Sequence, residues 1–182
     1  MEAVQALDLW VNGALAPLRH PWLVAVFEWL TGMGTGATGV AVALVAAGLL
    51  MAGGRGRLVA PLWLTLAGAE AATWAVKFLV GRARPAFLEG VSAASPSFPS
   101  AHATVSMALY GFLGLAIASG WPERRRAVLG AAAVAVGLIG FSRLFLSLHY
   151  LSDVLAGYAV GGLALWLGWS WAEARGAALK SP

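Results

Sequence analysis

Long apolar runs separated by short polar links dominate the chain. Five of these runs approach the length of about 20 apolar residues that a helix needs to cross a bilayer. They occupy residues 34–53, 58–80, 101–120, 127–147 and 151–171. Most links are short, so consecutive helices should be antiparallel, and residues 81–100 form the one long connection. The pattern predicts an all-α, polytopic membrane helix bundle with five full transmembrane helices.

The first 33 residues follow a different pattern, because polar residues interrupt their apolar runs and His20-Pro21 divides them. Neither half is long enough to span the bilayer alone. We expect two amphipathic helices lying in the membrane interface, and a single tilted or re-entrant sixth span is the alternative. The chain is then one integral-membrane domain over residues 1–182. Its parts are N-terminal interfacial helices (1–33), the transmembrane bundle (34–171) and a cytoplasmic tail (172–182).

Composition supports a membrane protein. The chain is 60% hydrophobic and 11% charged, with a mean hydropathy of +0.78, whereas a soluble domain carries about 25% charged residues. No cysteine is present, which excludes disulfide and thiol chemistry. The net charge of +4 forms no basic stripe with interleaved aromatic residues, so we expect no nucleic-acid partner.

Basic residues give the orientation. One group falls in the links after the first and third spans and after the last, and should be cytoplasmic by the positive-inside rule. This group contains Arg55, Arg57, Arg124, Arg125, Arg126, Arg175 and Lys180. The opposite side then receives Lys77, Arg82, Arg84 and Arg143. We therefore expect a multi-pass protein of the inner (plasma) membrane, with a cytoplasmic C-terminus and a polar site facing the periplasm or exterior.

Three polar blocks interrupt the apolar pattern on this outer side. In the first, Lys77 and Arg84 are seven residues apart, so a continuous helix would place both on one face. Two converging cations suit phosphoryl oxygens, although a cluster that only anchors a helix end is the simpler alternative. The second block is Pro99-Ser100-Ala101-His102, in which Ser100 is a plausible N-cap. Its free N–H groups would bind an anion, or the block is only a capped helix with an interfacial histidine.

The third block runs from Ser142-Arg143 to Asp153 and is the most informative. His149 and Asp153 have the spacing i, i+4, which places them on one face of a helix. A carboxylate on one imidazole nitrogen fixes the tautomer and leaves the other nitrogen free to attack. Arg143 supplies another phosphate contact. An interfacial ion pair without chemical function is the alternative.

Together the blocks resemble the three-part signature of the phosphatidic acid phosphatase type 2 superfamily, in its membrane lipid phosphatase branch. The signature reads K-x6-R-P, P-S-G-H and S-R-x5-H-x3-D, and the spacing within each block agrees. The resemblance extends over residues 34–171. Ala101 is the one departure, because the family usually has glycine there. The backbone N–H is retained, but the added methyl group is expected to narrow the pocket or alter the loop.

The resemblance implies roles for individual residues. His149 attacks phosphorus and forms a phosphohistidine, and Asp153 orients its imidazole. His102 protonates the leaving oxygen and then activates water. The phosphoryl oxygens are held by Lys77, Arg84, Ser100, the Ala101 N–H and Arg143. Arg82 is expected to contact a second phosphate or a headgroup, or to remain exposed at the interface.

The carboxylates are scattered along the chain, so we expect no metal site and no cofactor, with side-chain cations replacing Mg²⁺. The predicted reaction is hydrolysis of a lipid phosphate or diphosphate that enters from the bilayer. Undecaprenyl diphosphate, converted to undecaprenyl phosphate and phosphate, is the preferred substrate. The alternatives are phosphatidylglycerophosphate, phosphatidate and lipid A. Two rival classes are a non-enzymatic lipid-phosphate binder or transporter and a haloperoxidase-like protein, whose known members are soluble.

Overall fold

The computed structural model describes residues 2–85 and 95–176, and these residues contain helices and no strand. Three short 3₁₀ turns, Ala16–Leu18, Gly56–Leu58 and Pro122–Arg124, lie between the helices. The helices are α1 (Glu2–Leu15), α2 (Pro21–Gly32), α3 (Gly36–Ala52), α4 (Val59–Val80), α5 (Ala101–Gly120), α6 (Arg125–Phe145) and α7 (Leu151–Ala174). The all-α prediction is therefore confirmed for this part of the chain.

The predicted count of five full spans is not confirmed, because the described residues contain four candidate spans, or five with a bent pair of helices. In residues 2–85 and 95–176, four helices are long and apolar enough to cross a membrane: α4 and α6, each with its preceding turn, α5 and α7. The predicted span 34–53 is only the 17-residue helix α3, which follows α2 after a bend of 51°. Thr35 starts the new helix there, because its hydroxyl accepts a hydrogen bond from the Thr38 N–H at 3.1 Å. A fifth span exists only if α2 and α3 together cross as one bent unit.

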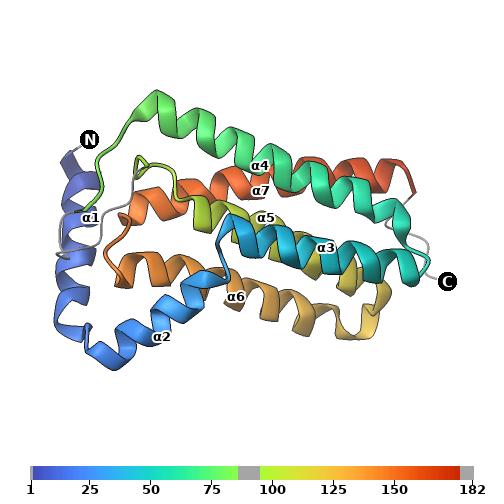
Figure 1. Ribbon diagram of the computed structural model, residues 1–182, viewed down its shortest axis with the longest axis horizontal. Helices are drawn as coiled ribbons and strands as arrows, with labels where there is room; N and C mark the ends of the chain where they lie inside the picture. Colours follow the sequence, from blue (N-terminus) through green and yellow to red (C-terminus); the bar gives the residue numbers. More distant parts are fainter. Residues whose placement is uncertain (1, 86–94, 177–182) are drawn as a thin grey trace.

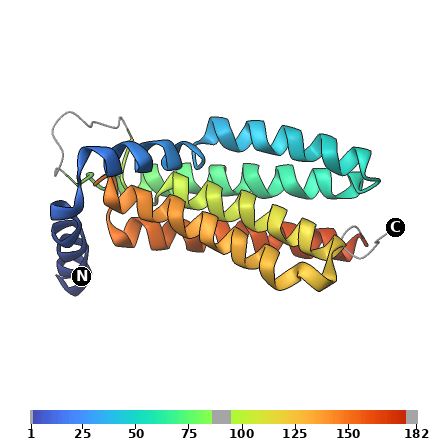
Figure 2. The same cartoon turned by 90° about the horizontal axis from the view of Figure 1, so that it is seen from below.

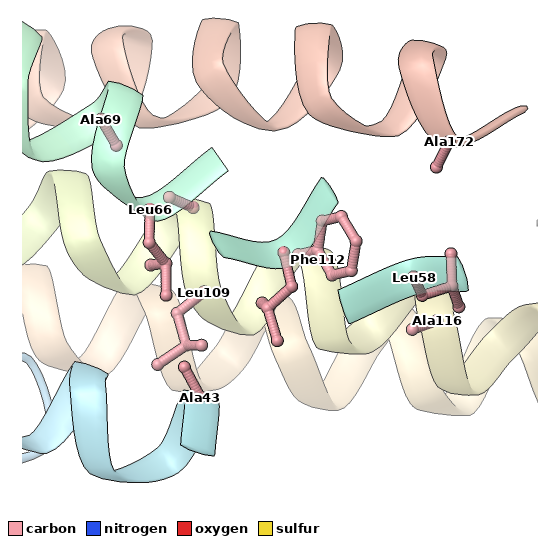
Figure 3. Packing of buried hydrophobic residues seen from close by; sticks show 10 residues of the cluster. Ala43, Leu58, Leu66, Ala69, Leu109, Phe112, Ala116 and Ala172 are labelled. Carbon is pink, nitrogen blue, oxygen red and sulfur yellow. The ribbon is translucent and has the colours of Figure 1, made fainter. Parts of the chain in front are cut away.

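The bundle places α5 at its centre, in contact with α3, α4, α6 and α7. Helices α3 to α7 run along the long axis, whereas α1 lies across one end of the bundle (Figures 1 and 2). Of the two N-terminal helices, α2 packs along α6, while α1 contacts α6 and α7. Figure 3 shows the apolar core, in which Leu109 of α5 lies between Leu66 of α4 and Ala43 of α3, and Phe112 of α5 lies further along the bundle.

Glycines on α7 allow its close contact with α5. A Cβ placed on Gly161 would lie 2.5 Å from the carbonyl oxygen of Thr104 and 2.9 Å from the Cβ of Met107. A Cβ on Gly157 would lie 2.6 Å from the carbonyl oxygen of Ser100. These two glycines, one helical turn apart, let the α7 backbone reach the start of α5. The approach brings the second polar block next to the third.

Substitution of Gly161 by alanine should weaken the α5–α7 contact. The new methyl group meets a backbone carbonyl that cannot rotate away, so we expect a loss of about 1–3 kcal/mol in stability. Thermal unfolding in detergent measures this loss. Gly130→Ala is the control, since a Cβ there meets nothing within 4 Å. Equal unfolding temperatures for the two variants would contradict the close contact.

Candidate active site

The three polar blocks meet at the end of the bundle that α1 crosses (Figure 1). Lys77 lies in the last turn of α4, and Arg143 in the last turn of α6. Ser100 precedes α5 and Asp153 lies in the first turn of α7. The antiparallel arrangement brings two helix C-termini and two N-termini together. All four of these side chains are buried.

His149 and Asp153 lie close together, although not on one helix face as their spacing suggested. Helix α7 begins at Leu151, so His149 belongs to the loop before it. The carboxylate of Asp153 turns back as part of a capping box, and its Oδ2 accepts the Tyr150 N–H at 2.9 Å. The same oxygen lies 3.4 Å from His149 Nδ1 and accepts a short hydrogen bond from the Ser97 hydroxyl. The i, i+4 spacing therefore brings the two side chains together because Asp153 caps the N-terminus of α7, and not because both residues lie on one helix face.

Arg84 identifies the tautomer of His149. Its guanidinium lies 3.1 Å from His149 Nε2 and also donates to the carbonyl oxygens of Ser95 and Leu148 at 2.9 and 2.8 Å. A guanidinium has donors and no acceptor, so Nε2 must present its lone pair to Arg84. The hydrogen is then on Nδ1, which faces Asp153. This arrangement leaves Nε2 as the nucleophilic nitrogen.

Burial is the largest of several influences on the imidazole, which together lower the pKa of His149 to about 4. The hydrogen bond to Asp153 raises the pKa and opposes burial, while the positive charges of Arg143 and Arg84 lower it further. His149 is therefore neutral at physiological pH in the substrate-free protein.

Two buried polar atoms at this end of the bundle have no hydrogen-bond partner among the described residues: Ser100 Oγ and Arg143 Nε. Ser100 occupies the N-cap position as expected, but its hydroxyl caps nothing. The guanidinium of Arg143 donates to Thr31 Oγ1 at 2.7 Å. Lys77 Nζ donates to the carbonyl oxygen of Pro96. Unsatisfied buried donors are costly, and an anion placed between these groups would satisfy them.

The predicted residues His102 and Ala101 begin α5. The first hydrogen bond across this helix start runs from Thr104 N to the Ser100 carbonyl at 3.0 Å, so the N–H groups before Thr104 point out of the helix end. The turn between α2 and α3 packs against His102, since a Cβ on Gly34 would lie 3.3 Å from its Cβ. The start of α5 thus offers N–H donors and an imidazole to the same region.

Sequence reasoning missed Asp8, Ser97 and Thr31, and it described Arg82 incompletely. Arg82 pairs with the carboxylates of Asp8 and Asp153 at 2.8 and 2.7 Å, partners that neither expectation for it included. Two polar residues one turn apart, Asp8 and Asn12, were the available signal for the role of α1. No group of three or more metal-ligating side chains occurs in residues 2–85 and 95–176. Metal independence stays a prediction.

The tautomer and charge of His149 can be measured by nitrogen NMR of histidine-labelled protein, with His149→Gln to identify its signals. We expect a neutral imidazole with hydrogen on Nδ1 between pH 7 and 5, because the pKa lies below the ordinary histidine value of about 6.5. Asp153→Asn should lower the pKa further, since it removes the group that opposes burial. A titration of His149 between pH 6 and 7 in the substrate-free protein would contradict this geometry.

Comparisons with known proteins agree with the arrangement of the three blocks. The PAP2 superfamily profile matches residues 58–177, which contain all of them. Phosphatidylglycerophosphatase B of Bacillus subtilis (strain 168) is 29% identical over 170 residues, covering 91% of this chain and 83% of the relative.

Two crystal structures are also similar. One is a transmembrane PAP2-type phosphatidylglycerolphosphate phosphatase from Bacillus subtilis, with a TM-score of 0.89 and 26% identity over 96% of this chain and 88% of that chain. The other, Aquifex aeolicus LpxE, has a TM-score of 0.75 and 21% identity over 90% and 95% of the two chains, and shows the same fold. The resemblance carried by the three polar blocks is confirmed: the chain belongs to the PAP2 superfamily and is a multi-pass membrane lipid phosphatase.

Proposed function

We propose that this phosphatase removes the terminal phosphate of phosphatidylglycerophosphate through a phosphohistidine at His149, without a metal ion. Two comparisons support this substrate: the 29% identical Bacillus protein is named phosphatidylglycerophosphatase B, and the Bacillus structure at TM-score 0.89 is described as a phosphatidylglycerolphosphate phosphatase. The expected preference for undecaprenyl diphosphate has no such support and gives way to this alternative. Phosphatidate and lipid A also stay as alternatives.

The observation that carries the catalytic proposal is a pair of buried donors without a partner in residues 2–85 and 95–176, Ser100 Oγ and Arg143 Nε. They belong to the same end of the bundle as Lys77, Arg84 and the lone pair of His149 Nε2. Protein interiors seldom leave donors unsatisfied, and a phosphoryl group accepts hydrogen bonds on every oxygen. Three cations and several fixed donors supply the positioning and charge stabilisation that phosphoryl transfer requires.

The first step begins when a phosphoryl oxygen takes over the hydrogen bond that Arg84 now donates to His149. This exchange frees Nε2, which attacks phosphorus so that an N–P bond forms and the bond to the lipid oxygen breaks. His102, protonated in the substrate complex, donates that proton to the leaving lipid oxygen, which becomes a hydroxyl. Asp153 accepts the hydrogen bond from Nδ1–H and stabilises the positive charge that develops on the ring.

The second step returns the enzyme to its starting state. His102, now neutral, accepts a proton from water, and the water oxygen attacks phosphorus. The N–P bond breaks, its electron pair returns to Nε2, and inorganic phosphate leaves. The N–H groups at the start of α5, including that of Ala101, and the Ser100 hydroxyl hold the equatorial oxygens in both steps.

Substrate choice is tested with a panel of detergent-solubilised lipids: phosphatidylglycerophosphate, undecaprenyl diphosphate, phosphatidate and lipid A. We expect the highest kcat/KM for phosphatidylglycerophosphate, with full phosphate release in EDTA. A higher value for undecaprenyl diphosphate would restore the substrate expected from the sequence.

The His149→Ala variant is the control for mechanism in the same assay, and we expect no release above background. Ser100→Ala removes one oxygen donor and should lower kcat about 10²–10³-fold if the hydroxyl binds the transition state. Unchanged phosphate release by His149→Ala would overturn the proposed nucleophile whatever the lipid.

The site end should face the periplasm or exterior. The links that contain Arg55, Arg57 and Arg124–Arg126 lie at the opposite end of the bundle, between α3 and α4 and between α5 and α6 (Figure 1). The positive-inside rule makes that end cytoplasmic.

Orientation is tested with a reporter enzyme fused after Pro182 in living cells. We expect a cytoplasmic signal, because α7 runs from the site to the basic end. A fusion at residue 92, between the first and second blocks, is the matched control and should report the other side. A periplasmic signal from the C-terminal fusion would reverse the orientation.

A further inference from the structure

Helix α1 is held by polar groups, although it is rich in apolar residues. Only Asp8 and Asn12 are buried in it, whereas Leu7, Leu9 and Trp10 are exposed. A buried carboxylate is unfavourable unless it is paired and hydrogen-bonded. The contacts of Asp8 and Asn12 therefore help to hold α1 across this end of the bundle, beside the apolar packing of Val11 and Leu15.

Asp8 uses both of its oxygens on residues that surround Asp153. Its Oδ1 accepts the backbone N–H of Ser152 at 2.9 Å, and its Oδ2 accepts the Ser152 hydroxyl at 2.6 Å. The same Oδ2 accepts a hydrogen bond from the guanidinium of Arg82 at 2.8 Å. Helix α1 is thereby attached to the first turn of α7, one residue before Asp153.

Arg82 connects Asp8 to the carboxylate that faces His149. One nitrogen of its guanidinium donates to Asp8, and the other donates to Asp153 Oδ1 at 2.7 Å and to Ser152 Oγ at 2.7 Å. The guanidinium also lies 4.2 Å from the centre of the Tyr150 ring. Arg82 holds Oδ1 of Asp153, so the other oxygen, Oδ2, is directed at His149.

The chain around α1 also holds the loop that carries His149. Asn12 Oδ1 accepts a hydrogen bond from Ser147 Oγ at 3.1 Å, at a residue whose φ of 55° is unusual for a side chain larger than glycine. Arg19, after α1, donates to the carbonyl oxygen of Phe145 at 2.6 Å. The segment from Phe145 to Asp153 is therefore attached to the N-terminal region at both of its ends.

We infer that Asp8 and Arg82 are positioning residues for the phosphatase reaction, which fix the Asp153 carboxylate against His149 and make α1 part of the active site. The inference rests on the proposed function in one respect, the assignment of His149 and Asp153 as nucleophile and orienter. It assigns Arg82 to the carboxylates and not to a second phosphate or a headgroup of the substrate.

The two roles for Arg82 predict different kinetics. A residue that orients the nucleophile acts on kcat, because displacement of a reacting group by about 1 Å costs on the order of 10²-fold in rate. A ligand of the substrate headgroup acts mainly on KM. Removal of the Asp8 carboxylate separates the two roles further. If Arg82 is a positioning residue, this removal should lower kcat; if Arg82 binds the substrate headgroup, the removal frees its guanidinium for that binding.

Charge gives a readout that a purely structural role would not change. His149 faces Arg84 after α4, His102 of α5, Arg143 of α6 and Asp153 of α7. Arg82 offsets the negative charge of Asp153 from the opposite side. Its loss leaves more uncompensated negative charge beside His149, which should make the imidazole easier to protonate. The acid limb of the kcat/KM profile should then move to higher pH.

The experiment compares full-length Asp8→Asn, Arg82→Gln and the double variant on phosphatidylglycerophosphate in detergent. Glu2→Gln, at an exposed position of the same helix, is the matched control and should behave as wild type. We expect each single variant to lower kcat at least tenfold with KM changed less than twofold. The double variant should lose no more than the worse single variant, since both act on one carboxylate. The acid limb of the kcat/KM profile should move to higher pH in Arg82→Gln and return to its wild-type pH in Arg82→Lys.

Wild-type kcat in Asp8→Asn would overturn the inference, as would a rise in KM with constant kcat in Arg82→Gln. If either of these results is found while His149→Ala releases no phosphate, the inference fails but the proposed function is retained. Tryptophan fluorescence on heating separates unfolding from altered kinetics. If Asp8→Asn does not fold, Asp8→Glu replaces it, since this variant keeps the charge on a longer side chain. We expect the same loss of kcat in Asp8→Glu, and a wild-type kcat in that variant would overturn the inference.

Discussion

The buried carboxylate of Asp153 is the interaction on which this end of the molecule depends. Each of its oxygens has defined donors: Arg82 on one, and Ser97, the Tyr150 N–H and His149 on the other. A buried charge that has no contact with water requires such hydrogen-bond partners. The number of partners determines how many segments of the chain must meet at the carboxylate. The N-terminus of α7, the loop before it and the chain on either side of residues 86–94 are therefore brought to one point.

Membrane location explains why polar groups collect there. Along the bundle, helices satisfy their own backbone, and the core cluster that contains Leu66, Leu109 and Phe112 is apolar. Only the helix ends carry free N–H and carbonyl groups, so charged side chains are satisfied there. The same reasoning accounts for α1, which exposes apolar residues and buries Asp8 and Asn12. Its exposed Trp10 is suited to the interface between lipid and water.

Much of the architecture followed from the sequence, and its failures have identifiable causes. The predicted segments 58–80, 101–120 and 151–171 agree with α4, α5 and α7 within a few residues, because long apolar runs determine helices in a bilayer. The prediction for 34–53 as a full span was not confirmed, since a capped bend at Thr35 joins α3 to α2. Periodicity contains no information on such a bend between two apolar stretches.

The sequence by itself determined the family, the three polar blocks and their convergence at one end, because spacing within a block and alternation of helix direction are local properties. Only the tertiary structure decided which atoms meet. It placed His149 before α7 instead of on it, and paired Arg82 with Asp8 across more than 70 positions. Within the part of the chain that the structure describes, it also left Ser100 Oγ and Arg143 Nε without a partner. Contacts between distant residues depend on how helices pack, and one sequence does not encode that packing in any readable local pattern.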